Sequence, residues 1–152
     1  KFGTYKDELG TSTNANDIPL MRVEEMYLIL AEAQAMAGEP AAGAATLQNF
    51  VTTYRDAAYT CNATTDVAVQ DAVWMQRRIE LWGEGFSYFD LMRLNKGVDR
   101  RGAGFQAAYV YNIPAGDDAL ILRLPRAEIE GNPLISDAQN NPAASLPTPV
   151  SE

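Results

Sequence analysis

Apolar residues recur at helical spacing through the first half of the chain and predict successive helices. Residues 1–17 are polar and rich in turn formers, so a loop is expected there. Asp17 suits an N-cap and Pro19 a first helical turn, which predicts a helix that runs to about Ala37 and ends before Gly38. The apolar face predicted for this helix consists of Leu20, Val23, Met26, Tyr27, Leu30, Ala33 and Ala37.

A second helix of about fifteen residues is predicted to start at Pro40, because proline is favoured in the first helical turn. Its predicted core side carries Ala44, Leu47, Phe50, Val51 and Tyr54. Two helices joined by a turn of two or three residues form a helical hairpin. The many alanines let the two axes approach closely, as they do in tetratricopeptide-type repeats.

After a predicted loop over residues 55–65, a third helix is expected to begin at Asp66 as its N-cap. It carries Val69, Ala72, Val73 and Ile79 into the segment Gln76–Asn95, QRRIELWGEGFSYFDLMRLN, here called the signature segment. Gly83 and Gly85 weaken the helix at this point, so two helical pieces hinged around WGEG are predicted. The residues Ile79, Trp82, Phe86 and Phe89 are predicted to form one continuous apolar face, with Trp82 in the core.

Charged side chains are interleaved with this aromatic bulk. Arg77 lies three residues before Glu80, and Asp90 three before Arg93, so both pairs can meet on a helix surface. Ions that are partly buried need partners, which favours a structural role for these charges over a catalytic one. The ion-pair network predicted on this basis contains Arg22, Glu25, Arg77, Arg78, Glu80, Glu84, Asp90 and Arg93.

Beyond Asn95 the helical pattern ends. Residues 96–108 hold three glycines and a basic pair and are predicted to be irregular. Tyr109–Ile113 and Leu120–Leu124 predict either a small hairpin or two extended pieces, and Pro125 precedes a last helical turn. The chain therefore predicts one all-α domain over residues 1–152, with a loop-rich C-terminal section and an extended or disordered tail over residues 137–152.

Composition excludes several classes of function. The net charge of −8 argues against nucleic-acid binding, and no apolar run is long enough for a transmembrane helix. The chain has no histidine, so neither a Ser-His-Asp triad nor a histidine-rich zinc site can form. No cofactor or metal is predicted, because Gly102 and Gly104 lack the lysine of a phosphate loop and Asp117-Asp118 lacks the spacing of a calcium loop.

A hydrolase with paired carboxylates stays open on residue types alone, with Glu80 and Glu84 or Asp117 and Asp118 as candidates. Retaining glycosidases need two carboxyl groups about 5 Å apart across an open cleft. Glu80 and Glu84 lie among arginines that they are better placed to neutralise. We therefore predict that the chain is not an enzyme.

Three motifs in order resemble the SusD/RagB family of surface glycan-binding lipoproteins. The first is Leu20–Ala33, LMRVEEMYLILAEA, which is similar to a helix of that family. The second is the signature segment, with its pattern R-R-x-E-L-x-x-E-G-x-x-x-x-D-L-x-R, and the third is Leu124–Leu134, LPRAEIEGNPL. Phe86 and Ser87 stand where the family often has histidine and arginine.

The resemblance implies a non-catalytic protein that binds oligosaccharides at the outer membrane of a Gram-negative cell. Such proteins pass their ligand to a TonB-dependent, SusC-like transporter. The resemblance also implies that this chain is a C-terminal fragment, with the secretion signal and lipid-bearing cysteine upstream of Lys1. The alternative is a helical interaction scaffold that docks on the transporter and has no sugar site in this fragment.

Sugar binding generally uses exposed aromatic rings beside amides and acids. Trp74 and Trp82 are placed by periodicity within the third helix, whereas the irregular segment that follows favours exposure. The ligand-binding candidates are therefore Phe105, Tyr109 and Tyr111.

Overall fold

The computed structural model describes residues 21–145 and 147–150. These residues divide into two compact units, one ending at Trp82 and the other beginning at Gly83, and each is described by itself. The loop predicted over residues 1–17, the cap at Asp17 and the first turn at Pro19 lie outside the described residues. The prediction of a mainly helical chain is confirmed.

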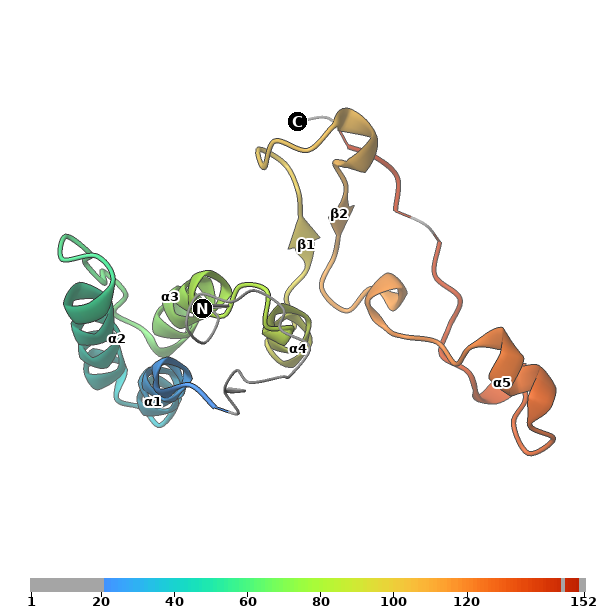
Figure 1. The fold of residues 1–152 in the computed structure, drawn as a ribbon, viewed down its shortest axis with the longest axis horizontal. Coiled ribbons are helices and arrows are strands. Elements are labelled where there is room, and N and C mark those ends of the chain that lie inside the picture. The colour runs from blue at the N-terminus through green and yellow to red at the C-terminus, as the bar shows by residue number, and fades with distance from the viewer. Residues whose placement is uncertain (1–20, 146, 151–152) are drawn as a thin grey trace, which may run out of the picture. The chain divides into compact units, whose positions relative to one another are not determined.

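Three helices form the first unit: α1 (Val23–Met36), α2 (Pro40–Tyr54) and α3 (Asp66–Glu80). Helix α1 contacts both α2 and α3, so it is the central element of this unit (Figure 1). Met21 and Arg22 are not helical, and Arg22 has extended backbone angles as the N-cap of α1. The helix therefore begins later than the residues 17–19 that local signals suggested.

The turn between α1 and α2 has the geometry that Gly38 predicted. Gly38 has a φ of +92°, its N–H donates to the carbonyl of Ala35, and the N–H of Glu39 donates to the carbonyl of Gln34. This pair of bonds is the Schellman motif, which satisfies carbonyls that the end of a helix leaves open. Pro40 is the first residue of α2, as predicted, so the helical hairpin is confirmed; its relation to tetratricopeptide repeats stays a prediction.

The core of the first unit lies on a different side of α1 from the one predicted. The buried residues of α1 are Leu28, Ala31 and Ala35. The predicted face is wrong, because Val23 and Leu30 are 64% and 48% exposed. Apolar side chains surround α1 on every side, so helical periodicity does not select one face. The core is completed from α2 and α3 by Leu47, Phe50, Val51, Val69 and Val73.

Gly43 sets how closely α1 and α2 pack. A Cβ atom at this position would lie 2.5 Å from the carbonyl oxygen of Ala31 and 3.1 Å from the Cβ of Ala35. Only hydrogen fits there without displacing the backbone of α1. The close approach that the alanines suggested therefore depends on this glycine.

Helix α3 is capped one residue earlier than predicted. The N-cap is Thr65, whose hydroxyl accepts a hydrogen bond from the N–H of Ala68 at 3.2 Å, and Asp66 is the first helical residue. Threonine fits the cap because its short side chain can reach an unpaired N–H of the first turn. Of the four residues predicted for its core side, Val69 and Val73 are fully buried, whereas Ile79 is exposed.

The signature segment is broken into two helices, as predicted. Helix α3 ends at Glu80, Gly85 adopts a φ of +85°, and α4 (Phe86–Arg93) follows. The continuous apolar face is wrong, because Ile79, Trp82 and Phe89 are 62%, 72% and 68% exposed. The break between the helices interrupts the regular rotation per residue, so spacing no longer predicts a shared face. The buried residues of the segment are Arg77, Glu80, Leu81 and Asp90.

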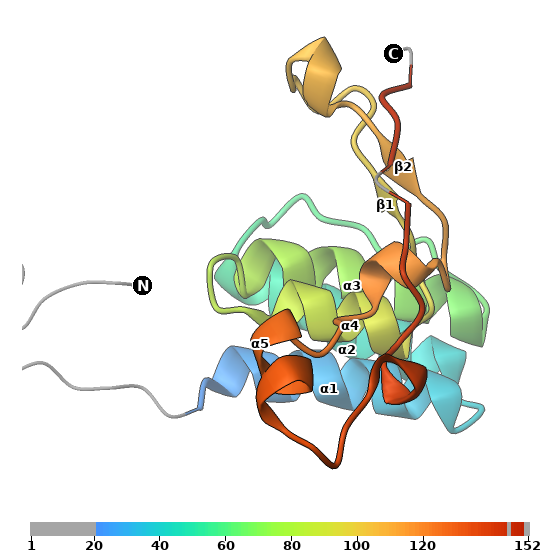
Figure 2. The same cartoon turned by 90° about the vertical axis from the view of Figure 1, so that its right-hand side faces the viewer.

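In the second unit, two short strands pair antiparallel: β1 (Val98–Asp99) and β2 (Asn112–Ile113). We call residues 98–113 the arm; the two strands lie side by side in Figures 1 and 2. Of the two alternatives predicted for Tyr109–Ile113 and Leu120–Leu124, the hairpin is wrong, because β2 pairs with the segment after Gly97. A Cβ on Gly97 would lie 2.4 Å from the carbonyl oxygen of Ile113, so glycine permits this pairing.

The remainder of the second unit contains short helices joined by extended chain. These helices are η2 (Ala107–Tyr109), η3 (Asp118–Leu120), α5 (Arg126–Gly131) and η4 (Asp137–Gln139). The helical turn predicted after Pro125 is confirmed as α5. Beyond η4, the side chain of Asn140 bonds the backbone of Leu124, and the N–H of Val150 donates to the carbonyl of Val110. The last described residues thus return to the arm.

Candidate functional site

Glu80 is the centre of a cluster of charges in the first unit. Its carboxylate accepts hydrogen bonds from Arg22 Nη2, and from Arg55 Nε and Nη2 at 2.6 and 2.9 Å. Arg22 Nη1 also donates to the backbone carbonyl of Glu80 at 3.0 Å. Arg55 reaches Glu24 as well, at 3.3 Å. The cluster therefore joins the end of α3 to the start of α1 and the end of α2.

The electrostatics of this cluster favour an ionised Glu80. Hydrogen bonds from Arg55 lower the pKa of the Glu80 carboxyl most; burial opposes them, and the hydrogen bond from Arg22 and the charges of both arginines lower the pKa further, so that the net shift is downward. Glu80 is only 8% exposed. A carboxylate that is ionised, buried and bonded on both oxygens can neither donate a proton nor reach a substrate. The contacts of Glu80 therefore indicate a structural role, in which it links the ends of α1, α2 and α3.

The other charges of the predicted network are divided between the two units. In the first, Arg77 pairs with Glu25 on α1 at 3.5 Å, and the Arg78 guanidinium lies 5.3 Å from the ring centre of Trp74. In the second, Arg93 Nε donates to Asp90 at 2.8 Å. Glu84 is half-buried in the turn between α3 and α4. Arg55 was missed by sequence reasoning, because it lies in a loop and only the tertiary fold brings it to Glu80.

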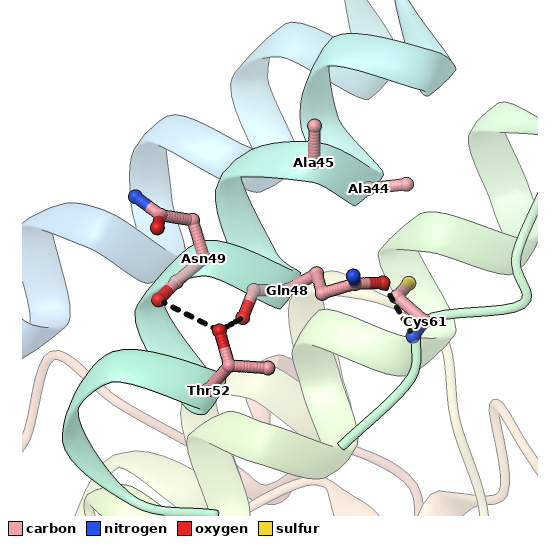
Figure 3. A pocket seen from close by; sticks show the side chains of 6 residues that line it. All are labelled: Ala44, Ala45, Gln48, Asn49, Thr52 and Cys61. Atoms are coloured by element: carbon pink, nitrogen blue, oxygen red, sulfur yellow. Dashed lines mark hydrogen bonds between the residues drawn. The ribbon is translucent and has the colours of Figure 1, made fainter. Parts of the chain in front are cut away.

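A shallow hollow of about 430 Å³ lies on the surface of α2. It is lined by Ala44, Ala45, Gln48, Asn49, Thr52 and Cys61 (Figure 3). The N–H of Cys61 donates to Gln48 Oε1 at 3.2 Å, and the hydroxyl of Thr52 donates to the carbonyl of Gln48 at 2.8 Å. The six lining residues include amides but neither an aromatic ring nor a carboxylate. The hollow therefore lacks the ring on which a sugar would stack.

The base of the arm is held by polar side chains on one face of the strand pair. Asp99 and Asn112 are paired in register, and Arg101 Nη2 bonds Asp99 at 2.6 Å. With its amide oriented to satisfy its neighbours, Asn112 donates to Asp99 at 2.7 Å and accepts from Arg101 at 3.2 Å. The Arg101 guanidinium lowers the pKa of Asp99 to about 2. This acid therefore stays ionised and keeps Arg101 engaged.

The arm also brings together two of the three aromatic candidates. The Arg100 guanidinium carbon lies 4.3 Å from the ring centre of Tyr111 and 5.0 Å from that of Phe105. Tyr109 is 57% exposed and Phe105 45%, whereas Tyr111 is half-buried. Arg100 and Asn112 were missed as site residues, since neither is unusual in a glycine-rich loop. Arg100 and the exposed rings of Phe105 and Tyr109 form a candidate binding surface within the arm.

Residues 21–145 and 147–150 offer little for acid catalysis or metal binding. Asp117, a candidate acid, accepts a hydrogen bond from the N–H of Ala119 at 2.8 Å and so caps η3. In this part of the chain there is no group of three or more Cys, Asp or Glu residues that could hold a metal ion. None of the helices described is long and apolar enough to cross a membrane.

The similarity to known proteins covers most of the chain and not only the three motifs. A SusD-like carbohydrate binding protein from Bacteroides vulgatus is 40% identical over 55% of the chain, with a TM-score of 0.49. A SusD superfamily protein from the same species is 26% identical over 88% of the chain, with a TM-score of 0.60. The matches span only 17% and 31% of those two structures. No curated protein matches the chain. The family model of the SusD family matches residues 1–141, and the chain therefore belongs to this family.

Proposed function

We propose that this chain is the C-terminal portion of a glycan-binding lipoprotein, and that it binds oligosaccharide without cleaving it. Membership of the SusD family, whose model matches residues 1–141, supports this proposal. The chain spans less than a third of the two similar structures, so the activity of a whole family member is inferred for it.

The aromatic surface of the arm is the observation that carries the proposal. Pyranose rings stack their C–H faces on aromatic side chains, and neighbouring polar groups then fix the sugar hydroxyls. Tyr109 and Phe105 offer exposed rings, while Arg100 supplies hydrogen-bond donors in the same loop. The hollow on α2 offers amides without rings, which makes the arm the better candidate.

We also propose that the chain does not cleave its ligand, because two candidate acids are engaged in structural hydrogen bonds. Glu80 is bonded by two arginines, and Asp117 caps a helical turn. A glycosidase needs a protonated acid and a second carboxylate that face the same sugar ring. Neither residue is available for that role, so binding without turnover is expected.

The family suggests the cellular setting. We propose an outer-membrane, surface-exposed location, with the lipid anchor upstream of Lys1, and delivery of the bound oligosaccharide to a SusC-like, TonB-dependent transporter. A binding protein of this kind needs fast release, which favours a shallow exposed surface such as the arm over a deep cavity. The setting and the partner rest on the family alone.

Native affinity electrophoresis on gels that contain different polysaccharides tests the proposal. The chain is expected to be retarded on at least one glycan gel relative to a non-binding marker protein in the same lane. A reducing-sugar assay on the same glycan is expected to detect no release. Release of sugar would contradict the non-catalytic proposal, whereas equal mobility on every gel would contradict binding.

A second candidate function, a helical scaffold that docks on the transporter, is favoured by the outer side of α1. Val23, Met26 and Leu30 are spaced along one stripe of this helix and are 64%, 42% and 48% exposed. Exposed apolar stripes of this kind are typical of surfaces that bind another protein segment. If no glycan retards the chain while the purified transporter binds it, and Leu30→Lys abolishes that binding, the scaffold function is supported instead.

A further inference from the structure

The side of the arm that carries Arg100 is fixed by strand register. Val98 pairs with Ile113 and Asp99 with Asn112, so continuing this register places Arg100 opposite Tyr111. Side chains alternate between the two faces of a strand pair. Asp99 and Asn112 occupy one face with Arg101, and Arg100 and Tyr111 therefore share the other.

Arg100 differs from the other arginines around it in its contacts. Arg101 is bonded to Asp99, and Arg93 to Asp90. Within the described residues, Arg100 contacts the rings of Phe105 and Tyr111 and makes no ion pair with a carboxylate. Rings that contact the face of a guanidinium orient it and leave the N–H groups at its edge free to bond an acceptor. The arm thus holds an arginine in place without neutralising it.

The local charge has the sign opposite to that of the whole chain. The arm, residues 98–113, contains two basic side chains, Arg100 and Arg101, and one acidic side chain, whereas the chain as a whole has a net charge of −8. The single acid is Asp99, which is already paired with Arg101. An anion that approaches the arm therefore meets local positive charge inside an otherwise acidic molecule.

We infer that the arm binds the anionic group of an acidic glycan, a uronate carboxylate or a sulfate ester, with Arg100 donating to it and the ring of Tyr109 or Phe105 contacting the same or the next sugar. This inference rests on the proposed glycan binding and names its substrate class. Arginine suits the role because its planar fork matches the two oxygens of a carboxylate or sulfate.

The test compares acidic polymers with matched neutral ones in native affinity gels. One pair is polygalacturonate and its methyl ester, and the other is dextran sulfate and dextran. The chain is expected to be retarded by at least one acidic polymer and less by its neutral partner, and the pair that responds distinguishes carboxylate from sulfate. Retardation should weaken as salt is raised from 20 to about 300 mM, because screening reduces exposed charge interactions.

Variants then assign the effect to Arg100. Arg100→Gln is expected to weaken binding to the acidic polymer by about tenfold to a hundredfold, the value of a hydrogen bond to a charged group. Arg100→Lys keeps the positive charge but not the planar guanidinium, so its affinity for the acidic polymer should lie between that of Arg100→Gln and that of the wild type. Arg123→Gln, an exposed arginine of the same unit outside the arm, is the matched control and should bind as the wild type does. Circular dichroism checks that all three variants fold.

The outcomes separate this inference from the function on which it rests. Equal retardation by both members of each pair would overturn the anionic preference while leaving glycan binding intact. An acidic preference that persists in Arg100→Gln would overturn the role of Arg100. Mobility unchanged by these four polymers and by every neutral glycan would overturn both this inference and the proposed function.

Discussion

Arg22 and Glu80 lie 58 residues apart in the chain, yet Arg22 bonds both the side chain and the backbone carbonyl of Glu80. Arg22 is the N-cap residue of α1, and Glu80 is the last residue of α3. The Arg22 guanidinium binds a helix-terminal carbonyl together with a carboxylate that Arg55 also bonds, in a largely buried place. The contact therefore fixes how α3 ends against α1.

Replacing Glu80 by alanine is expected to destabilise the chain by about 3 kcal/mol, because two arginines lose their carboxylate. The value lies at the low end for a buried pair, since the Arg55 side chain is 40% exposed. Urea unfolding followed by circular dichroism measures the change. The matched control is Glu130→Ala, which removes an exposed pair with Arg126 and should change the free energy of unfolding by less than about 0.5 kcal/mol. Equal effects of the two substitutions would contradict the structural role of Glu80.

Stability should depend on pH through the same carboxyl. The pKa of Glu80 in the folded chain is lowered, chiefly by hydrogen bonds from Arg55, from an ordinary value of 4.5. A lowered folded pKa stabilises the fold above the unfolded value, and this contribution is lost as pH falls through the folded value. The difference in melting temperature between wild type and Glu80→Gln should therefore be constant near neutral pH and shrink below about pH 4.5. A difference that grows on acidification would show that the pKa of Glu80 is raised, not lowered, in the folded chain.

Gly43→Ala should destabilise the helical hairpin by about 1–3 kcal/mol, since the added methyl group would collide with the backbone of α1. The clash must outweigh the gain of up to about 1 kcal/mol that alanine gives a helix over glycine. Gly131→Ala is the control, because nothing lies within 4 Å of the added Cβ in α5. Thermal unfolding of both variants measures the contrast. A stabilised Gly43→Ala variant would mean that α1 and α2 lie further apart than described.

Trp82 should be accessible to a solvent quencher. Its side chain is 72% exposed, whereas Trp74, the other tryptophan, is partly buried and contacts Arg78. Acrylamide should therefore quench a red-shifted component of the emission that Trp82→Phe removes and Trp74→Phe retains. Poor quenching in the Trp74→Phe variant would place Trp82 in a core, as helical spacing suggested.

Local signals predicted much of the helical framework. Gly38 and Pro40 set the turn between α1 and α2, because backbone preferences at helix ends depend on single residues. The glycines of the signature segment likewise predicted its break. The buried face of α1 could not be predicted in this way, since apolar residues surround that helix. Packing against α2 and α3 determines which face of α1 is buried, and this packing depends on the tertiary fold rather than on local sequence.

The candidate site was only partly predictable. Exposure of Phe105 and Tyr109 follows from their irregular, glycine-rich surroundings, which sequence composition reveals. The contact of Arg100 with Tyr111 depends on the register of two strands of two residues each. Strands so short show no alternation of polar and apolar residues, so neither their pairing nor the face that carries Arg100 could be read from the chain.

The most direct test of glycan binding by the arm compares wild type with Tyr109→Ala on the gel that most retards the wild type. Tyr109 is exposed and packs into no described core, so its loss should leave folding unchanged. Removing a ring that stacks on a sugar is expected to abolish most of the retardation, while mobility in a glycan-free gel stays that of the wild type. Tyr109→Phe, which keeps the ring, should remain retarded. Full retardation of Tyr109→Ala, together with that of Phe105→Ala, would contradict the account.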